Sequence, residues 1–113
     1  MVSFNASHKV VLDQMLLDVP GVRPGKMFGY PAYYAEKKLS ICIIEDSVGF
    51  KLPASRVSEL MSSNPKITHF QPMGRRKMRE WVQVNVEDSN DLFEYTEVFE
   101  ESIEYVLAVQ AGR

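Results

Sequence analysis

The stretch from Ala32 to Leu52 most constrains the fold, because it holds three short apolar runs separated by polar tripeptides. Residues 32–35, 39–44 and 48–52 have the composition and length of β-strands, with Glu36-Lys37-Lys38 and Glu45-Asp46-Ser47 between them. Connections this short join antiparallel neighbours, since parallel strands need a long crossover. The sequence therefore predicts an antiparallel meander at the centre of the chain.

The middle run is partly apolar on both of its faces. Strand alternation places Leu39, Ile41 and Ile43 on one face, and Ser40, Cys42 and Ile44 on the other. We therefore expect a covering element on each face. A second copy of the chain is one candidate for the second face, which motivates the hypothesis of a homodimer.

The flanking segments complete a predicted order α-β-β-β-α-β-β-α. Helices are expected at residues 7–18 (with Ser7 as N-cap), 53–61 and 91–110, further strands at 67–70 and 78–86, and a loop between the first helix and the meander. In the last strand Val82, Val84 and Val86 should face inward, and Trp81, Gln83 and Asn85 outward. This order predicts one α+β domain over residues 1–113, with helices packed on an antiparallel sheet.

Composition points to the cell interior and away from the membrane. The single cysteine excludes an intrachain disulfide framework, and no apolar run approaches the roughly 20 residues of a spanning helix. The N-terminus lacks the apolar region of a signal peptide. We expect a cytoplasmic protein that does not enter the membrane.

A basic cluster is the candidate partner-binding site. It comprises Arg75, Arg76, Lys77 and Arg79, four cations in five positions, followed by the only tryptophan, Trp81. The charge is asymmetric, since residues 1–79 hold 12 Lys/Arg against 6 Asp/Glu and residues 80–113 hold 1 against 9.

Alternation predicts that Arg79 and Trp81 share a strand face, where they would anchor a protein or stack on a nucleobase. The alternative is a solvated hairpin tip with Trp81 buried beneath the acidic C-terminal helix. A pI of about 5.7 disfavours a dedicated nucleic-acid binder.

The sequence offers no catalytic, cofactor-binding or metal-binding set of residues. Cys42 lies between isoleucines, which is typical of an inert buried thiol. His8 and His69 are far apart, and no Cys/His/Asp cluster has metal-ligand spacing. The chain is therefore expected to be a non-enzyme without a cofactor.

Two blocks of residues resemble the N-terminal domain of TfoX (Sxy)-like proteins, over about residues 22–108. The first contains Lys26-Met-Phe-Gly-Tyr-Pro-Ala-Tyr-Tyr and Gly49-Phe-Lys-Leu-Pro, and the second Phe70-Gln-Pro-Met-Gly-Arg and Met78-Arg-Glu-Trp-Val. The chain departs from the family where Arg75-Arg76-Lys77-Met78 is one residue longer and more basic than the usual Arg-Pro-Met. The resemblance implies a secretion-chaperone-like α+β fold.

The same resemblance implies a regulatory domain, because named members are linked to natural competence. It does not name a biochemical activity. The leading interpretation is a non-enzymatic module that binds a protein partner or a second copy of itself, and the alternative is a nucleic-acid-binding module that uses Arg75, Arg76, Lys77, Arg79 and Trp81.

Overall fold

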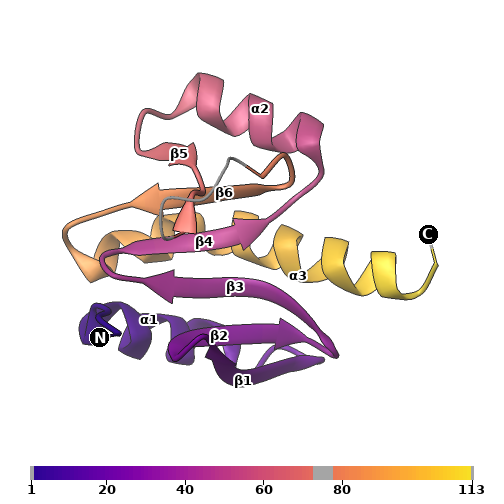
Figure 1. Cartoon of the computed structure of the whole chain (residues 1–113), viewed down its shortest axis with the longest axis horizontal. Helices are drawn as coiled ribbons and strands as arrows, with labels where there is room; N and C mark the ends of the chain where they lie inside the picture. Colours follow the sequence, from indigo (N-terminus) through magenta and orange to yellow (C-terminus); the bar gives the residue numbers. More distant parts are fainter. Residues whose placement is uncertain (1, 73–77, 113) are drawn as a thin grey trace.

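A six-stranded antiparallel sheet of order β1-β2-β3-β4-β6-β5 is the framework of the computed structural model (Figure 1). The structure describes residues 2–72 and 78–112. Its strands are β1 (Val22–Met27), β2 (Tyr30–Ala35), β3 (Lys38–Ile44), β4 (Ser47–Lys51), β5 (Ile67–His69) and β6 (Trp81–Asn85). Its helices are α1 (Ala6–Leu16), α2 (Ala54–Ser63), the 3-10 helix η2 (Ser89–Tyr95) and α3 (Thr96–Gln110). The predicted α+β class and antiparallel sheet are confirmed.

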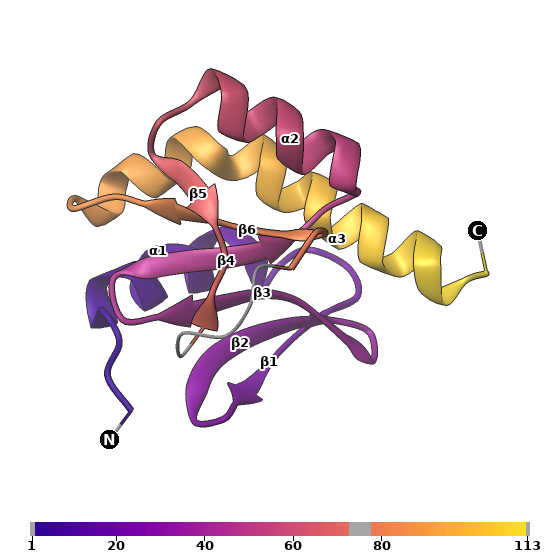
Figure 2. The same cartoon turned by 45° about the horizontal axis from the view of Figure 1, so that its top comes forward.

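One face of the sheet carries the main core beneath the helices. Figures 1 and 2 show α1 and α3 on this face, while α2 lies over the β5–β6 end. The central strands supply apolar residues to this core, namely Ile41, Ile43, Val48, Phe50, Val82 and Val84. From α3, Phe99 meets Phe50 edge to face with ring centroids 5.2 Å apart. The inward direction predicted for the valines of β6 is confirmed.

The strand β1 replaces a predicted loop, so the strand count of the predicted order was wrong by one. Pro24 and Gly25 indicated a turn, but β1 is an edge strand that pairs only with β2, and an edge tolerates proline. A Cβ at Gly25 would lie 3.0 Å from the ring of Tyr34, a tight contact that a small shift of this partly exposed ring would have to relieve.

A bulge in the β2–β3 pairing reverses two predicted side-chain directions. The register shifts between Tyr33 and Tyr34, which leaves Ser40 as the extra residue of β3. Ser40 therefore faces α3, where its hydroxyl is 2.8 Å from that of Ser102. Leu39, predicted to share a face with Ile41, instead packs with the cluster on the opposite face.

Two helix boundaries also differ from the prediction. The N-cap of α1 is Asn5, not Ser7, and its side chain accepts a hydrogen bond from the backbone N–H of His8. The long C-terminal helix predicted from Asp91 begins instead as the 3-10 helix η2, which Asp88 caps by accepting from the N–H of Asn90. Buried apolar residues of η2 and α3, among them Leu92, Phe99 and Ile103, pack in the same core. This shared apolar face explains why the sequence pattern predicted a single helix.

The second face of the sheet, on which Ala32, Cys42, Gly49 and Trp81 lie, is covered largely by the chain itself. Phe70, just after β5, stacks on Trp81 with ring centroids 5.2 Å apart and lies over Gly49. Ala32 and Cys42 are buried in the same small cluster. The two-sided apolar character of β3 is thus accounted for within one chain, and it no longer requires a second copy.

We predict that Gly49→Ala destabilises the fold markedly. A Cβ at this position would lie 2.5 Å from the ring of Phe70, so the ring must move away from Trp81. Overpacking of this kind costs about 1–3 kcal/mol of unfolding free energy. Urea unfolding followed by circular dichroism measures the loss.

The matched control is Gly25→Ala, whose Cβ meets only the half-exposed ring of Tyr34 and should cost less. Phe70→Leu in the Gly49→Ala background should recover part of the loss, because the smaller side chain leaves room for the methyl group. Equal stability of Gly49→Ala and the parent chain would contradict the packing described above.

Candidate functional site

The predicted basic site lies only partly within the described residues. Arg75, Arg76 and Lys77 fall outside them, so their arrangement is not part of the structure described. Arg79 is exposed and precedes β6, which begins at Trp81. The structure therefore describes only the last two members of the predicted set, Arg79 and Trp81.

Trp81 is buried, with 7% of its surface exposed, and its indole packs against Phe70. Arg79 instead lines a cleft beside α2. The expected pairing of Arg79 with Trp81 on one strand face is wrong, because the strand starts only at Trp81 and the two side chains have different surroundings. The indole contributes to the fold of the second face and does not offer an open stacking surface.

The cleft beside α2 is the candidate site that contains Arg79, and we call it the α2 cleft. Helix α2 provides one wall through Ala54, Val57, Ser58 and Met61, which recur at the spacing of a single helical face. The other wall consists of His69, Met78 and Arg79. The cleft encloses about 340 Å³. Its lining is mainly apolar, and Arg79 is the Lys, Arg, Asp or Glu residue among the described residues that line it.

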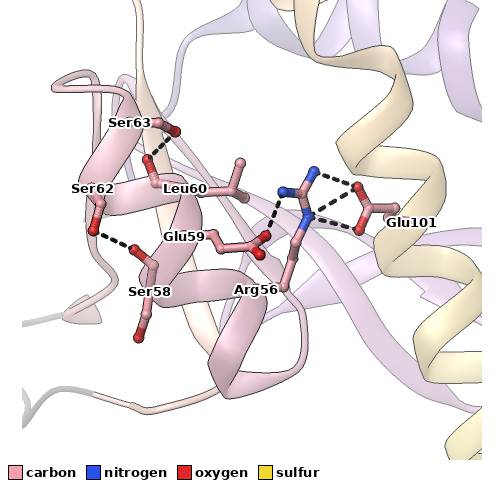
Figure 3. A network of polar contacts seen from close by, with 7 residues as sticks. All are labelled: Arg56, Ser58, Glu59, Leu60, Ser62, Ser63 and Glu101. Atoms are coloured by element: carbon pink, nitrogen blue, oxygen red, sulfur yellow. Dashed lines mark hydrogen bonds and ion pairs between the residues drawn. The ribbon is translucent and has the colours of Figure 1, made fainter.

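The wall formed by α2 is fixed from the side of α3 (Figure 3). Arg56 donates through Nε and one terminal nitrogen to both carboxylate oxygens of Glu101, at 2.8–3.2 Å, and it also reaches Glu59 at 3.0 Å. The hydrogen bonds to Glu101 and then Glu59 raise the pKa of Arg56 further above its ordinary value. This bidentate contact and the buried side chains of Val57 and Leu60 hold α2 on the domain.

The polar groups of the α2 cleft do not form a nucleophile–base pair in this structure. Ser58 and His69 both line it, but no hydrogen bond between them is found among the residues described. Within residues 2–72 and 78–112, no group of three His, Cys, Asp or Glu side chains is placed to hold a metal ion.

His8 and Cys42 are both buried and contribute to the fold, and the burial expected for the Cys42 thiol is confirmed. His8 is fully buried, its Nε2 donates to the carbonyl of Asp46 at 3.0 Å, and its Nδ1 contacts the hydroxyl of Ser89. It thereby joins α1 to the β3–β4 turn and to η2, a role that the sequence did not reveal. Cys42 is fully buried, and burial raises the pKa of its thiol to about 12.

These features define an α+β domain. Helices cover one face of its sheet, Phe70 of the same chain covers part of the other face, and a cleft lies at the β5–β6 end. Comparisons of the chain with protein-family models, with curated proteins and with solved structures found no match. In the part of the chain that the structure describes, no helix has the length and apolar character needed to span a bilayer.

We predict that Cys42 resists modification in the folded protein. A thiol with a pKa of about 12 carries little thiolate near pH 8, and the side chain has no exposed surface. A chromogenic disulfide reagent should therefore react slowly with the native chain and rapidly with the chain in urea. Equal rates in both conditions would show that the second face opens readily.

Proposed function

We propose that this chain is a non-enzymatic regulatory module of the TfoX N-terminal type, which acts in the cytoplasm and binds a protein partner through the α2 cleft. The observation that carries the proposal is the cleft itself, a mainly apolar depression that is also lined by Arg79. The partner segment would carry apolar side chains for the cleft and carboxylates for the basic rim.

The apolar lining supports binding of side chains from a partner. Met61 and Met78 lie on opposite walls, and methionine adapts its shape to different apolar groups. Met78 has 41% of its surface exposed, so it is accessible before binding. A volume of about 340 Å³ is enough for a few side chains, although it is small for a whole protein interface.

Charge supports an acidic partner segment. Arg79 lines the cleft, and the sequence places Arg75, Arg76 and Lys77 only two to four positions before it. Such a concentration of cations speeds encounter with an acidic surface and disfavours basic ones. The contribution of Arg75, Arg76 and Lys77, which lie outside the described residues, is inferred from their sequence positions alone.

The TfoX-type assignment is supported by a contact between its two sequence blocks. Gly49 belongs to the first block, Phe70 and Trp81 to the second, and all three meet on the second face. Residues that mark the resemblance thus act together in packing. The link of that family to the control of competence is the basis for proposing a regulatory role.

Burial of Trp81 weighs against the alternative of nucleic-acid binding. An indole that is buried and stacked on Phe70 is not free to stack on a base. Nucleic-acid binding would then depend on contacts between the basic cluster and phosphate groups. Phosphate contact alone predicts binding that falls steeply as salt rises. Titration of labelled single- and double-stranded oligonucleotides at about 50 mM salt decides this alternative.

The proposal is tested by selecting peptides from a displayed random library on the folded chain. Selected peptides should combine acidic and apolar residues, and their affinity is measured by fluorescence anisotropy. The double variant Met61→Glu/Arg79→Glu places a carboxylate in the cleft and reverses its rim charge. We expect this variant to weaken binding at least tenfold, which corresponds to about 1.4 kcal/mol.

Lys66→Glu is the matched control, because it reverses an exposed positive charge that does not line the cleft. Its peptide affinity should stay near that of the parent chain. Circular dichroism of each variant separates loss of binding from loss of folding. Equal affinity of the selected peptides for the double variant and for the parent chain would overturn the proposal. Salt-sensitive binding of oligonucleotides, together with a library that yields no binding peptide, would also overturn it.

A further inference from the structure

A second depression is lined by residues of the sheet and of the C-terminal part of α3. We call it the Trp81 groove. Leu39 and Trp81 come from the sheet, and Val106 and Val109 from α3. The groove encloses about 430 Å³, which lies in the range of small-molecule sites. It is separate from the α2 cleft, because the two share no lining residue.

The charged groups of this groove are both positive. Lys38 and Lys51 line it, and no Asp or Glu is found among the described residues that line it. Lys51 has one distant partner, Glu80, with 3.7 Å between its Nζ and the nearest carboxylate oxygen. An ammonium held this loosely keeps donors for another anion. For Lys38, no ion pair is found among the described residues.

The carbonyls at the described end of α3 are largely engaged within the chain. The last carbonyls of a helix carry partial negative charge, but several of these are satisfied here. Ala111 donates to the carbonyls of Leu107 and Ala108, and Gly112 donates to that of Val109. Gln110 donates to the carbonyl of Val106 and of Ala35. Lys38 and Lys51 are thus the charged residues that line the groove in the described part of the chain, with the carboxylate of Glu80 3.7 Å from the Nζ of Lys51.

We propose that the Trp81 groove binds a small amphipathic carboxylate, a molecule with one apolar chain or ring and one carboxylate. Its apolar part lies on Val106, Val109 and the edge of the indole, and its carboxylate pairs with Lys38 and Lys51. The combination of an apolar floor with two ammonium groups fits this class, because each part of the ligand meets a matching surface. This site is independent of the protein partner proposed for the α2 cleft.

The single tryptophan makes the groove directly observable. Decanoate is titrated into the full chain below its micelle concentration while the fluorescence of Trp81 is recorded. We expect a saturable change with a Kd below about 1 mM, the weak end of specific binding. Decanol, which has the same chain without the charge, should bind at least tenfold more weakly. Shifts of the indole N–H and valine methyl resonances locate the ligand.

Variants distinguish this site from general binding to apolar surface. Lys38→Ala/Lys51→Ala should weaken decanoate binding at least tenfold, whereas Lys37→Ala/Lys66→Ala removes the same charge elsewhere and should leave it unchanged. Val109 has 46% of its surface exposed, so Val109→Glu should fold while its carboxylate repels the ligand. No saturable change, equal affinity for decanol, or insensitivity to the groove variants would overturn the proposal.

Discussion

The stacking of Phe70 on Trp81 above Gly49 is the contact on which the second face of the sheet depends. A sheet whose central strand is apolar on both sides needs two covers, and only one face receives the helices α1 and α3. The two aromatic rings provide the other cover from within the chain. Gly49 makes this possible, because any larger residue would push the ring of Phe70 away from the sheet.

This contact also determines which surfaces remain for function. Trp81 packs against Phe70 and belongs to the fold, and the exposed basic residue two positions before it, Arg79, lines the α2 cleft. The bidentate pair of Arg56 and Glu101 holds that helix in place. Two separate depressions are described, the α2 cleft, which Arg79 lines together with mainly apolar residues, and the Trp81 groove, which two lysines line.

Local sequence patterns, such as the alternation of apolar residues and the residues typical of turns, were sufficient to predict much of the fold. Alternation and turn chemistry predicted the meander, the inward valines of β6 and the α+β class, all of which the structure confirms. The misses come from tertiary context. Pro24 is compatible with β1 only because this strand is at an edge, and Ser40 faces α3 only because of a bulge.

The candidate site was harder to predict, for physical reasons. The sequence indicated Arg79, but Met61 and His69 come from distant segments, and nothing local indicates that they share a cleft. For Trp81, alternation gave the correct face, but the covering ring of Phe70 could not be deduced from a strand pattern. The role proposed for Arg75, Arg76 and Lys77 remains a prediction from the sequence.

The most direct test of this account is the accessibility of Trp81 to a neutral quencher. Acrylamide quenching and the emission maximum of the single tryptophan are measured in the native chain and in urea. A buried indole packed on Phe70 predicts blue-shifted emission and weak quenching in the native chain, both lost together with the secondary structure. Native emission and quenching equal to those in urea would contradict the account, because the second face would then be uncovered.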